Sequence, residues 1–99
     1  MSGETQTRVK SKLDLREPKT YAVILHNDDI TTMDFVVEVL VRVFHKTAAE
    51  GAEIMMNVHE RGKGVAGVFT YDIAVTKKMQ ADLLSREHNF PLKLTVDEA

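Results

Sequence analysis

The 99-residue chain contains no cysteine, no tryptophan, only two prolines and no long apolar run. Without cysteine, a disulfide scaffold, a thiolate zinc site and a cysteine nucleophile are excluded. No segment approaches the ~20 consecutive apolar residues of a membrane-spanning helix. The first twelve residues are polar and lack the apolar stretch of a secretion signal. Because a cysteine-free chain also fits a reducing compartment, we expect a cytoplasmic protein that does not contact a membrane.

The chain also lacks an excess of positive charge, since 13 lysines and arginines face 15 acidic residues. A nucleic-acid-binding domain would carry a concentrated basic face, so we expect no nucleic-acid partner. Residues 1–18 are almost entirely polar and cannot offset their ordering entropy by burial. We therefore predict a flexible N-terminal tail over residues 1–18 and a single folded domain over residues 19–99.

Hydrophobic periodicity and capping signals predict six elements in this domain. Strands are expected over residues 21–25, 65–69 and 92–96, and helices over 33–46, 47–60 and 71–87. A threonine three residues before an acid, Thr31 before Asp34, marks the first helix start. Thr47 and Glu50 form a capping box for the second helix, and Gly62 is expected to end it. The order β-α-α-β-α-β indicates an α+β fold of two layers, with helices packed on one face of a small sheet.

The acceptor-rich run Asn27-Asp28-Asp29 follows the first predicted strand. These side chains either turn the chain and place negative charge before a helix N-terminus, or form a site for a cation or an ammonium group. Residue types alone do not separate the two interpretations.

A second candidate is His59, near the end of the predicted second helix. It either interacts with the terminal carbonyl groups or joins Met55 and Ala52 on a helix face that points to the core or a pocket. The methionines of the first two predicted helices, Met33, Met55 and Met56, either fill the core or line an adaptable pocket. The four histidines lack the spacing of a zinc site, and no hydrolase or phosphate-loop motif is present, so we expect no metal, no cofactor and no enzymatic activity.

The run YAVILHNDDITTMDFV over residues 21–36 closely resembles the ClpS adaptor family. The resemblance continues, in the same order, through residues 55–59, 62–64, 67–70, 74–77 and 91–95. It implies a three-stranded antiparallel sheet with three helices. It also implies an adaptor that binds proteins by a free N-terminal Leu, Phe, Tyr or Trp and delivers them to the N-terminal domain of a Clp-family AAA+ unfoldase-protease.

The same resemblance assigns roles to individual residues. Its ligands of the α-amino group correspond to Asn27, Asp28 and His59. Its hydrophobic pocket corresponds to Leu25, Thr31, Met33, Val36, Met55, Val58 and Leu92. Its contact with the unfoldase corresponds to Asp72 and Lys77. The chain departs from the family pattern at Ile30, Thr32, Val75 and Phe90, and Val75 lies beside the expected unfoldase contact.

Two other functions are compatible with the same order of elements. The first is a scaffold or ribosome-associated interaction domain that has no amino-acid pocket, since fold alone does not determine function. The second, less favoured by the residues, is an enzyme that uses Asp28, Asp29 and His59 as an acid–base or metal set.

Overall fold

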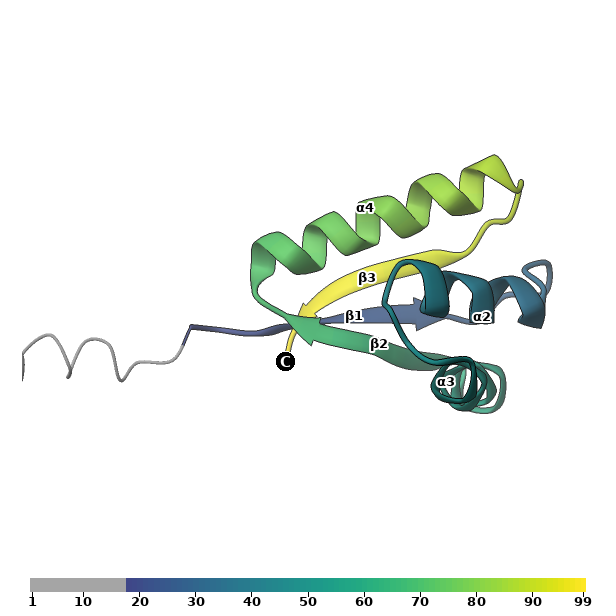
Figure 1. Cartoon of the computed structure of the whole chain (residues 1–99), viewed down its shortest axis with the longest axis horizontal. Helices are drawn as coiled ribbons and strands as arrows, with labels where there is room; N and C mark the ends of the chain where they lie inside the picture. Colours follow the sequence, from purple (N-terminus) through teal and green to yellow (C-terminus); the bar gives the residue numbers. More distant parts are fainter. Residues whose placement is uncertain (1–17) are drawn as a thin grey trace, which may run out of the picture.

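The computed structural model describes residues 18–99 (Figure 1). Its elements are β1 (Tyr21–His26), α2 (Met33–Arg42), α3 (Ala48–Arg61), β2 (Lys63–Phe69), α4 (Tyr71–Glu87) and β3 (Lys93–Glu98). The predicted order β-α-α-β-α-β and the α+β class are therefore confirmed. The tail predicted over residues 1–18 lies, except for Pro18, outside the described residues.

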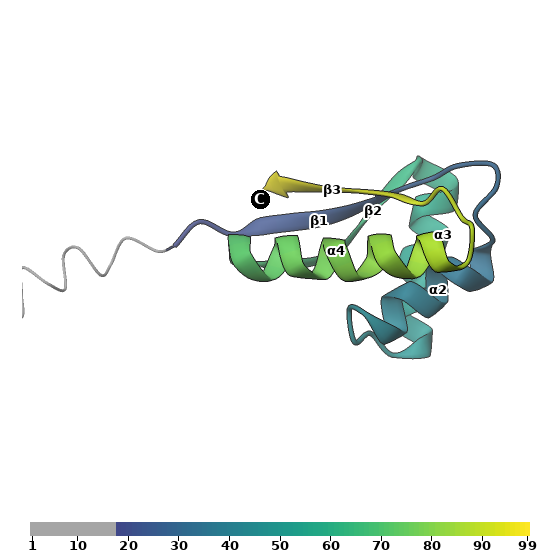
Figure 2. The same cartoon turned by 90° about the horizontal axis from the view of Figure 1, so that it is seen from above.

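The three strands form one antiparallel sheet in the order β2-β1-β3. Strand β1 is central because its apolar residues are buried by partners on both sides; Val23 and Leu25 are fully buried. Figure 2 shows α2 and α4 on the same side of this sheet. Helix α3 packs against α2 and against the edge strand β2. The helical layer and the sheet thus enclose a single core.

Helix α2 supplies the largest share of that core, as the scarcity of polar positions in its sequence predicts. Phe35, Val36, Val39 and Leu40 are all buried. Burying one such side chain contributes roughly 1.5–3 kcal/mol to folding. The position of α2, and of the loop that precedes it, is therefore strongly fixed.

The prediction that this helix reaches Lys46 was wrong, because α2 ends at Arg42. His45 adopts a left-handed conformation with φ of 58°, and the Lys46 N–H donates to the Leu40 carbonyl at 3.0 Å. The Lys77 ammonium of α4 donates to the Val43 carbonyl at 2.8 Å, where the helix dipole favours positive charge. A tertiary partner therefore stabilises a helix end that the local sequence does not mark.

Helix α3 begins and ends as predicted from local signals. The Thr47 hydroxyl accepts from the Glu50 N–H at 3.0 Å, and the Glu50 carboxylate accepts from the Thr47 N–H at 2.9 Å. Gly62 terminates the helix with φ of 90°, a conformation that favours glycine. These short-range contacts fix both ends of the helix that faces the candidate site.

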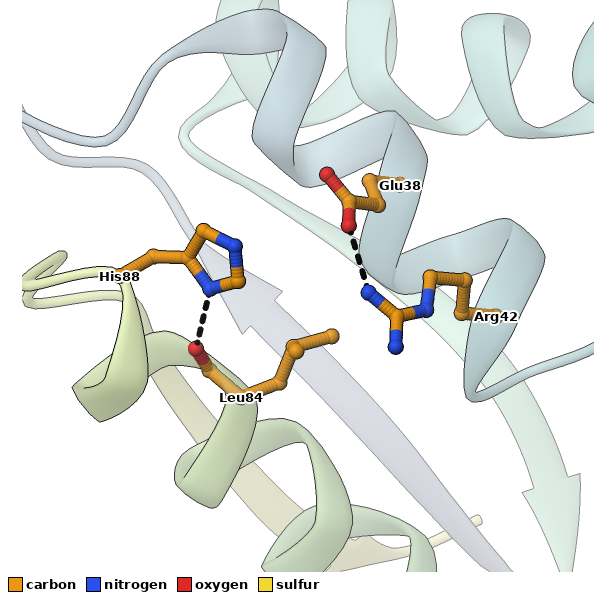
Figure 3. Close-up of polar contacts among 4 residues, drawn as sticks. All are labelled: Glu38, Arg42, Leu84 and His88. Atoms are coloured by element: carbon orange, nitrogen blue, oxygen red, sulfur yellow. Dashed lines mark hydrogen bonds and ion pairs between the residues drawn. The ribbon is translucent and has the colours of Figure 1, made fainter.

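Helices α2 and α4 also meet near the end of α4 (Figure 3). The His88 ring packs on Phe35 with ring centroids 5.1 Å apart, and its Nδ1–H donates to the Leu84 carbonyl at 3.0 Å. On α2, Arg42 and Glu38 form an exposed ion pair at 2.7 Å, of a kind that contributes only about 0.3–0.5 kcal/mol. The ion pair lies within α2, so the contact between the rings of Phe35 and His88 is what joins the two helices here.

Candidate functional site

A cavity of about 410 Å³ lies where the β1–α2 loop meets α2 and α3. Eleven residues line it: Asn27, Asp28, Asp29, Ile30, Thr31, Thr32, Met33, Val36, Met55, Val58 and His59. Of the ten residues that the sequence assigned to the amino-group site and the pocket, eight are in this set. The structure therefore brings two separate segments of the chain, residues 27–36 and 55–59, around one opening.

The two remaining pocket candidates do not line the cavity. Leu25 is fully buried in the core. Leu92 is 6% exposed and borders a different hollow, together with Phe90 and Pro91. Both side chains belong to the packed interior.

The β1–α2 loop is held by the side chain of Asp28. One carboxylate oxygen accepts from the backbone N–H groups of Ile30 at 2.8 Å and Thr31 at 2.6 Å, and the other accepts from the Thr31 hydroxyl at 2.7 Å. The Thr31 hydroxyl is thereby occupied, and Thr32 caps α2 by accepting from the Phe35 N–H at 3.1 Å. The prediction that Thr31 caps this helix was therefore wrong.

These hydrogen bonds also keep the carboxylate of Asp28 ionised. Burial raises its pKa, but the bonds from Thr31 and the Ile30 N–H outweigh that effect, so the pKa lies below its ordinary value. A carboxylate offers about four acceptor positions, and three are used within the loop. Asp28 thus presents a fixed negative charge with one acceptor position left.

Three polar side chains at the mouth of the cavity are exposed and have no partner of their own. Within residues 18–99, the side chains of Asn27, Asp29 and His59 make no hydrogen bond and no ion pair. The Asn27 N–H donates to the Gly62 carbonyl at 2.8 Å, which fastens the loop to the end of α3 that carries His59. The mouth therefore offers acceptors to a bound molecule without loss of a hydrogen bond or ion pair in the described part of the chain.

Asp29 was not among the predicted ligands of the amino group, although it belongs to the run of acceptors that the sequence analysis singled out. It lines the same cavity as Asp28, with its side chain exposed. The signal in the sequence was the pair of adjacent acids. Asp28 accepts hydrogen bonds within the loop, whereas the Asp29 side chain makes none with residues 18–99, and the sequence does not reveal this difference.

The deep end of the cavity is apolar. Val58 is 2% exposed and Val36 is 6% exposed, and Met55 is half-buried between the two helices. Met33, in the first turn of α2, is 42% exposed and stands at the mouth. The cavity therefore has acceptors at its entrance and a hydrophobic floor.

Close approach of β2 to α3 shapes this floor. A Cβ atom on Gly64 would lie 2.9 Å from the Val58 Cγ2 and 3.5 Å from the Ile54 carbonyl oxygen. Only a residue without a side chain leaves Val58 in its present position. Gly64 thus supports the floor of the cavity without lining it.

The predicted face of α3 is only partly correct. Met55 and His59 line the cavity, but Ala52 is exposed, so the prediction that it points to the core or a pocket was wrong. The helix instead packs through Gly51 and Val58, which are buried. Gly51 allows α2 to come close, since a Cβ there would lie 3.4 Å from the Val37 Cγ1.

The two residues assigned to the unfoldase contact lie on α4, outside the cavity. Asp72 is exposed in the first turn, and its carbonyl accepts from the Thr76 hydroxyl at 2.9 Å. Lys77 is half-buried and holds the end of α2 through the Val43 carbonyl. Five residues apart on a helix, the two side chains point in directions roughly 140° apart.

Among residues 18–99, no group of three or more His, Asp or Glu side chains is arranged to hold a metal ion. In the same part of the chain, every helix is too short or too polar to cross a membrane.

Comparison with known proteins gives a consistent result. The family model described as "ATP-dependent Clp protease adaptor protein ClpS" matches residues 16–95. A ClpS adapter protein of Acetivibrio thermocellus is 50% identical over 97 residues, which are 98% of each chain. That of Syntrophus aciditrophicus is 54% identical over 82 residues, covering 83% of this chain and 77% of the relative.

A solved structure shares the fold. The structure of Agrobacterium tumefaciens ClpS2 bound to L-phenylalaninamide superposes with a TM-score of 0.80 at 41% identity. The match covers 84% of this chain and the whole of that one.

Proposed function

This chain belongs to the ClpS family of Clp protease adaptors, which are not enzymes, and we propose that it captures proteins by a free N-terminal Leu, Phe, Tyr or Trp. It then delivers them to a Clp-family AAA+ unfoldase-protease. L-Phenylalaninamide, the ligand of the Agrobacterium ClpS2, combines a free α-amino group with a carboxamide, as the first residue of a protein does. The cysteine-free sequence favours the cytoplasm as the place of action.

A single observation supports this proposal most directly: acceptors that have no partner among residues 18–99 stand at the mouth of a cavity whose floor is apolar. An α-amino group has a pKa of about 7.7–8.0 and is mostly an ammonium ion at neutral pH. It brings three N–H donors, and the proposed acceptors are the Asn27 amide oxygen, the free position on Asp28 and a ring nitrogen of neutral His59. Asp29 adds a second negative charge at the same opening.

The first side chain of the bound protein would occupy the apolar floor formed by Val36, Met55 and Val58. Each charge-assisted hydrogen bond contributes about 1.5–3 kcal/mol, and burial of a Leu or Phe side chain contributes a similar amount. Association costs at least ~4 kcal/mol, so one terminal residue should give at most micromolar affinity, near −8 kcal/mol. Such affinity suits an adaptor, because its cargo must be released.

Met33 is the proposed gatekeeper of this cavity. It stands at the mouth, in the first turn of α2, close to the loop that would hold the ammonium group. Leu, Phe, Tyr and Trp carry a CH₂ at Cβ, whereas Val and Ile branch there and would press a methyl group against the thioether. Overpacking of this kind costs typically ~1–3 kcal/mol.

The remaining roles inferred from the family concern delivery. We propose that Asp72 and Lys77 contact the N-terminal domain of the unfoldase and that residues 1–18 take part in delivery. Both residues lie on α4, away from the cavity, so cargo and unfoldase would be bound at different places on the domain.

The test is the requirement for a free amine. A fluorescent peptide that begins with Phe should bind, and the same peptide with an acetylated N-terminus should not, because acetylation removes the charge and two donors. Asn27→Ala and His59→Ala should each weaken binding at unchanged melting temperature, since neither side chain has a partner among residues 18–99. Equal affinity for the two peptides, measured by fluorescence anisotropy, would instead favour a scaffold domain without an amino-acid pocket.

A further inference from the structure

The most exposed large apolar side chain in the described part of the chain stands at the mouth of this cavity. Ile30 is 66% exposed, more than any other large hydrophobic residue of the region 18–99. It lies in the β1–α2 loop and lines the cavity beside Met33. Exposed apolar area of this size at the rim of a binding site gains free energy when a ligand covers it.

The backbone that carries Ile30 is fixed before any ligand arrives. Its N–H donates to the Asp28 carboxylate at 2.8 Å, and the next residue, Thr31, is bonded to the same carboxylate through its N–H and its hydroxyl. A side chain on a loop held in this way contacts a ligand without the loss of conformational entropy that ordering the backbone would require. The exposed side chain of Ile30 is therefore held in a fixed position at the mouth of the cavity.

The size of a peptide unit determines which part of the cargo reaches this side chain. When the first residue places its ammonium at the acceptors and its side chain on the floor, its carbonyl must leave through the mouth. Consecutive Cα atoms are 3.80 Å apart, so the second residue lies at the rim. The other exposed rim residues are polar, except Met33, which the first residue already contacts.

We propose that Ile30 forms a subsite for the side chain of the second residue of the cargo and favours an apolar side chain there. This inference depends on the proposed capture of a free N-terminal residue. Leucine in the second position would cover part of the Ile30 side chain, whereas serine would leave it in water. Each buried methylene is worth about 0.8 kcal/mol, or roughly a fourfold change in affinity, so the expected preference is about four- to tenfold.

The experiment uses three fluorescent peptides that all begin with Phe. The first has Leu in the second position, the second has Ser there, and the third has Ser in the second position and Leu in the third. Fluorescence anisotropy measures their affinity for the wild-type chain, for Ile30→Ala and for Met79→Ala. Met79 is the matched control, because it is 58% exposed and lies on α4 outside the cavity.

The proposal predicts that the wild-type chain and Met79→Ala prefer the first peptide four- to tenfold over the other two. In Ile30→Ala this preference should disappear, so that the first and the second peptide bind with equal affinity. Equal affinity of the wild type for the first two peptides, a preference only for the third, or a preference that persists in Ile30→Ala would each overturn it. Failure of all three peptides to bind would instead overturn the proposed function, so the two failures are distinguishable.

Discussion

Substitutions at Asp28 and Asp29 should separate two roles that neighbouring carboxylates play in one loop. Asp28 accepts three hydrogen bonds from Ile30 and Thr31, whereas Asp29 makes none with residues 18–99. Asp28→Asn retains one oxygen for the two backbone N–H groups, and its amide nitrogen can donate to the Thr31 hydroxyl oxygen. The loop should therefore keep its shape but lose its charge-assisted bonds.

The expected magnitudes follow from these contacts. Hydrogen bonds to a charged group contribute about 1.5–3 kcal/mol and neutral ones about 0.5–1.5 kcal/mol, and partial exposure of Asp28 lowers the difference. Asp28→Asn should thus lose about 1 kcal/mol of the free energy of unfolding, and Asp28→Ala roughly 2–3 kcal/mol. For a domain of this size, 1 kcal/mol corresponds to about 4–8 °C in melting temperature. Asp29→Asn should leave the melting temperature unchanged and weaken peptide binding about fivefold, through loss of a charge worth ~1 kcal/mol in water.

The effect of pH supplies an independent check. Because the folded protein lowers the pKa of Asp28, the unfolded chain binds the proton more readily. The stability that this carboxylate contributes is complete above its unfolded pKa of about 3.9 and is lost as the pH falls through the lower, folded value. The difference in melting temperature between the wild type and Asp28→Asn should therefore shrink below about pH 4.

Thermal unfolding and fluorescence anisotropy with a Phe-initiated peptide measure both quantities. The reasoning is refuted if Asp28→Ala keeps the melting temperature of the wild type, or if Asp29→Asn lowers it as much as Asp28→Asn does. If Asp29→Asn leaves the peptide affinity unchanged, Asp29 is not part of the binding site, and this result does not affect the role of Asp28 in the loop.

Four further predictions concern the cavity and the delivery surface. Met33→Ala should admit Val- and Ile-initiated peptides while keeping Leu and Phe; a uniform loss of affinity, with a lower melting temperature, would make Met33 ordinary core filler. His59→Gln, whose amide oxygen can still accept a hydrogen bond, should keep more affinity for a Phe-initiated peptide than His59→Ala does; equal affinities of the two variants would show that His59 does not accept from the ligand. Gly64→Ala should cost ~1–3 kcal/mol and weaken binding, because its Cβ would displace a floor residue 2.9 Å away; unchanged unfolding in urea would contradict this. Asp72→Lys should weaken unfoldase binding and leave peptide affinity and melting temperature unchanged. Lys77→Glu should lower both unfoldase binding and the melting temperature, because Lys77 also holds the end of α2. If a reconstituted degradation assay detects no change in either variant, Asp72 and Lys77 are not part of the unfoldase contact.

The sequence by itself determined the features that depend on neighbouring residues. The capping box of Thr47 and Glu50 and the left-handed Gly62 fix the ends of α3 through contacts within a few residues, so their pattern is readable directly. The order of strands and helices follows from periodicity for the same reason. Five of the eight correctly predicted cavity-lining residues lie in a family motif that is contiguous in the chain, from Asn27 to Val36.

Only the tertiary structure decided features that depend on distant segments. Helix α2 ends early, at a point where the Val43 carbonyl accepts from Lys77, 34 residues further along the chain. Asn27 comes beside the end of α3 because its N–H bonds to the Gly62 carbonyl, and this contact completes the mouth of the cavity. Leu25 is withdrawn into the core since β1 has strands on both sides and helices above it. Sequence patterns indicate interactions between residues that are close in the chain. The residues that line a cavity together depend on which surfaces come into contact when the core packs.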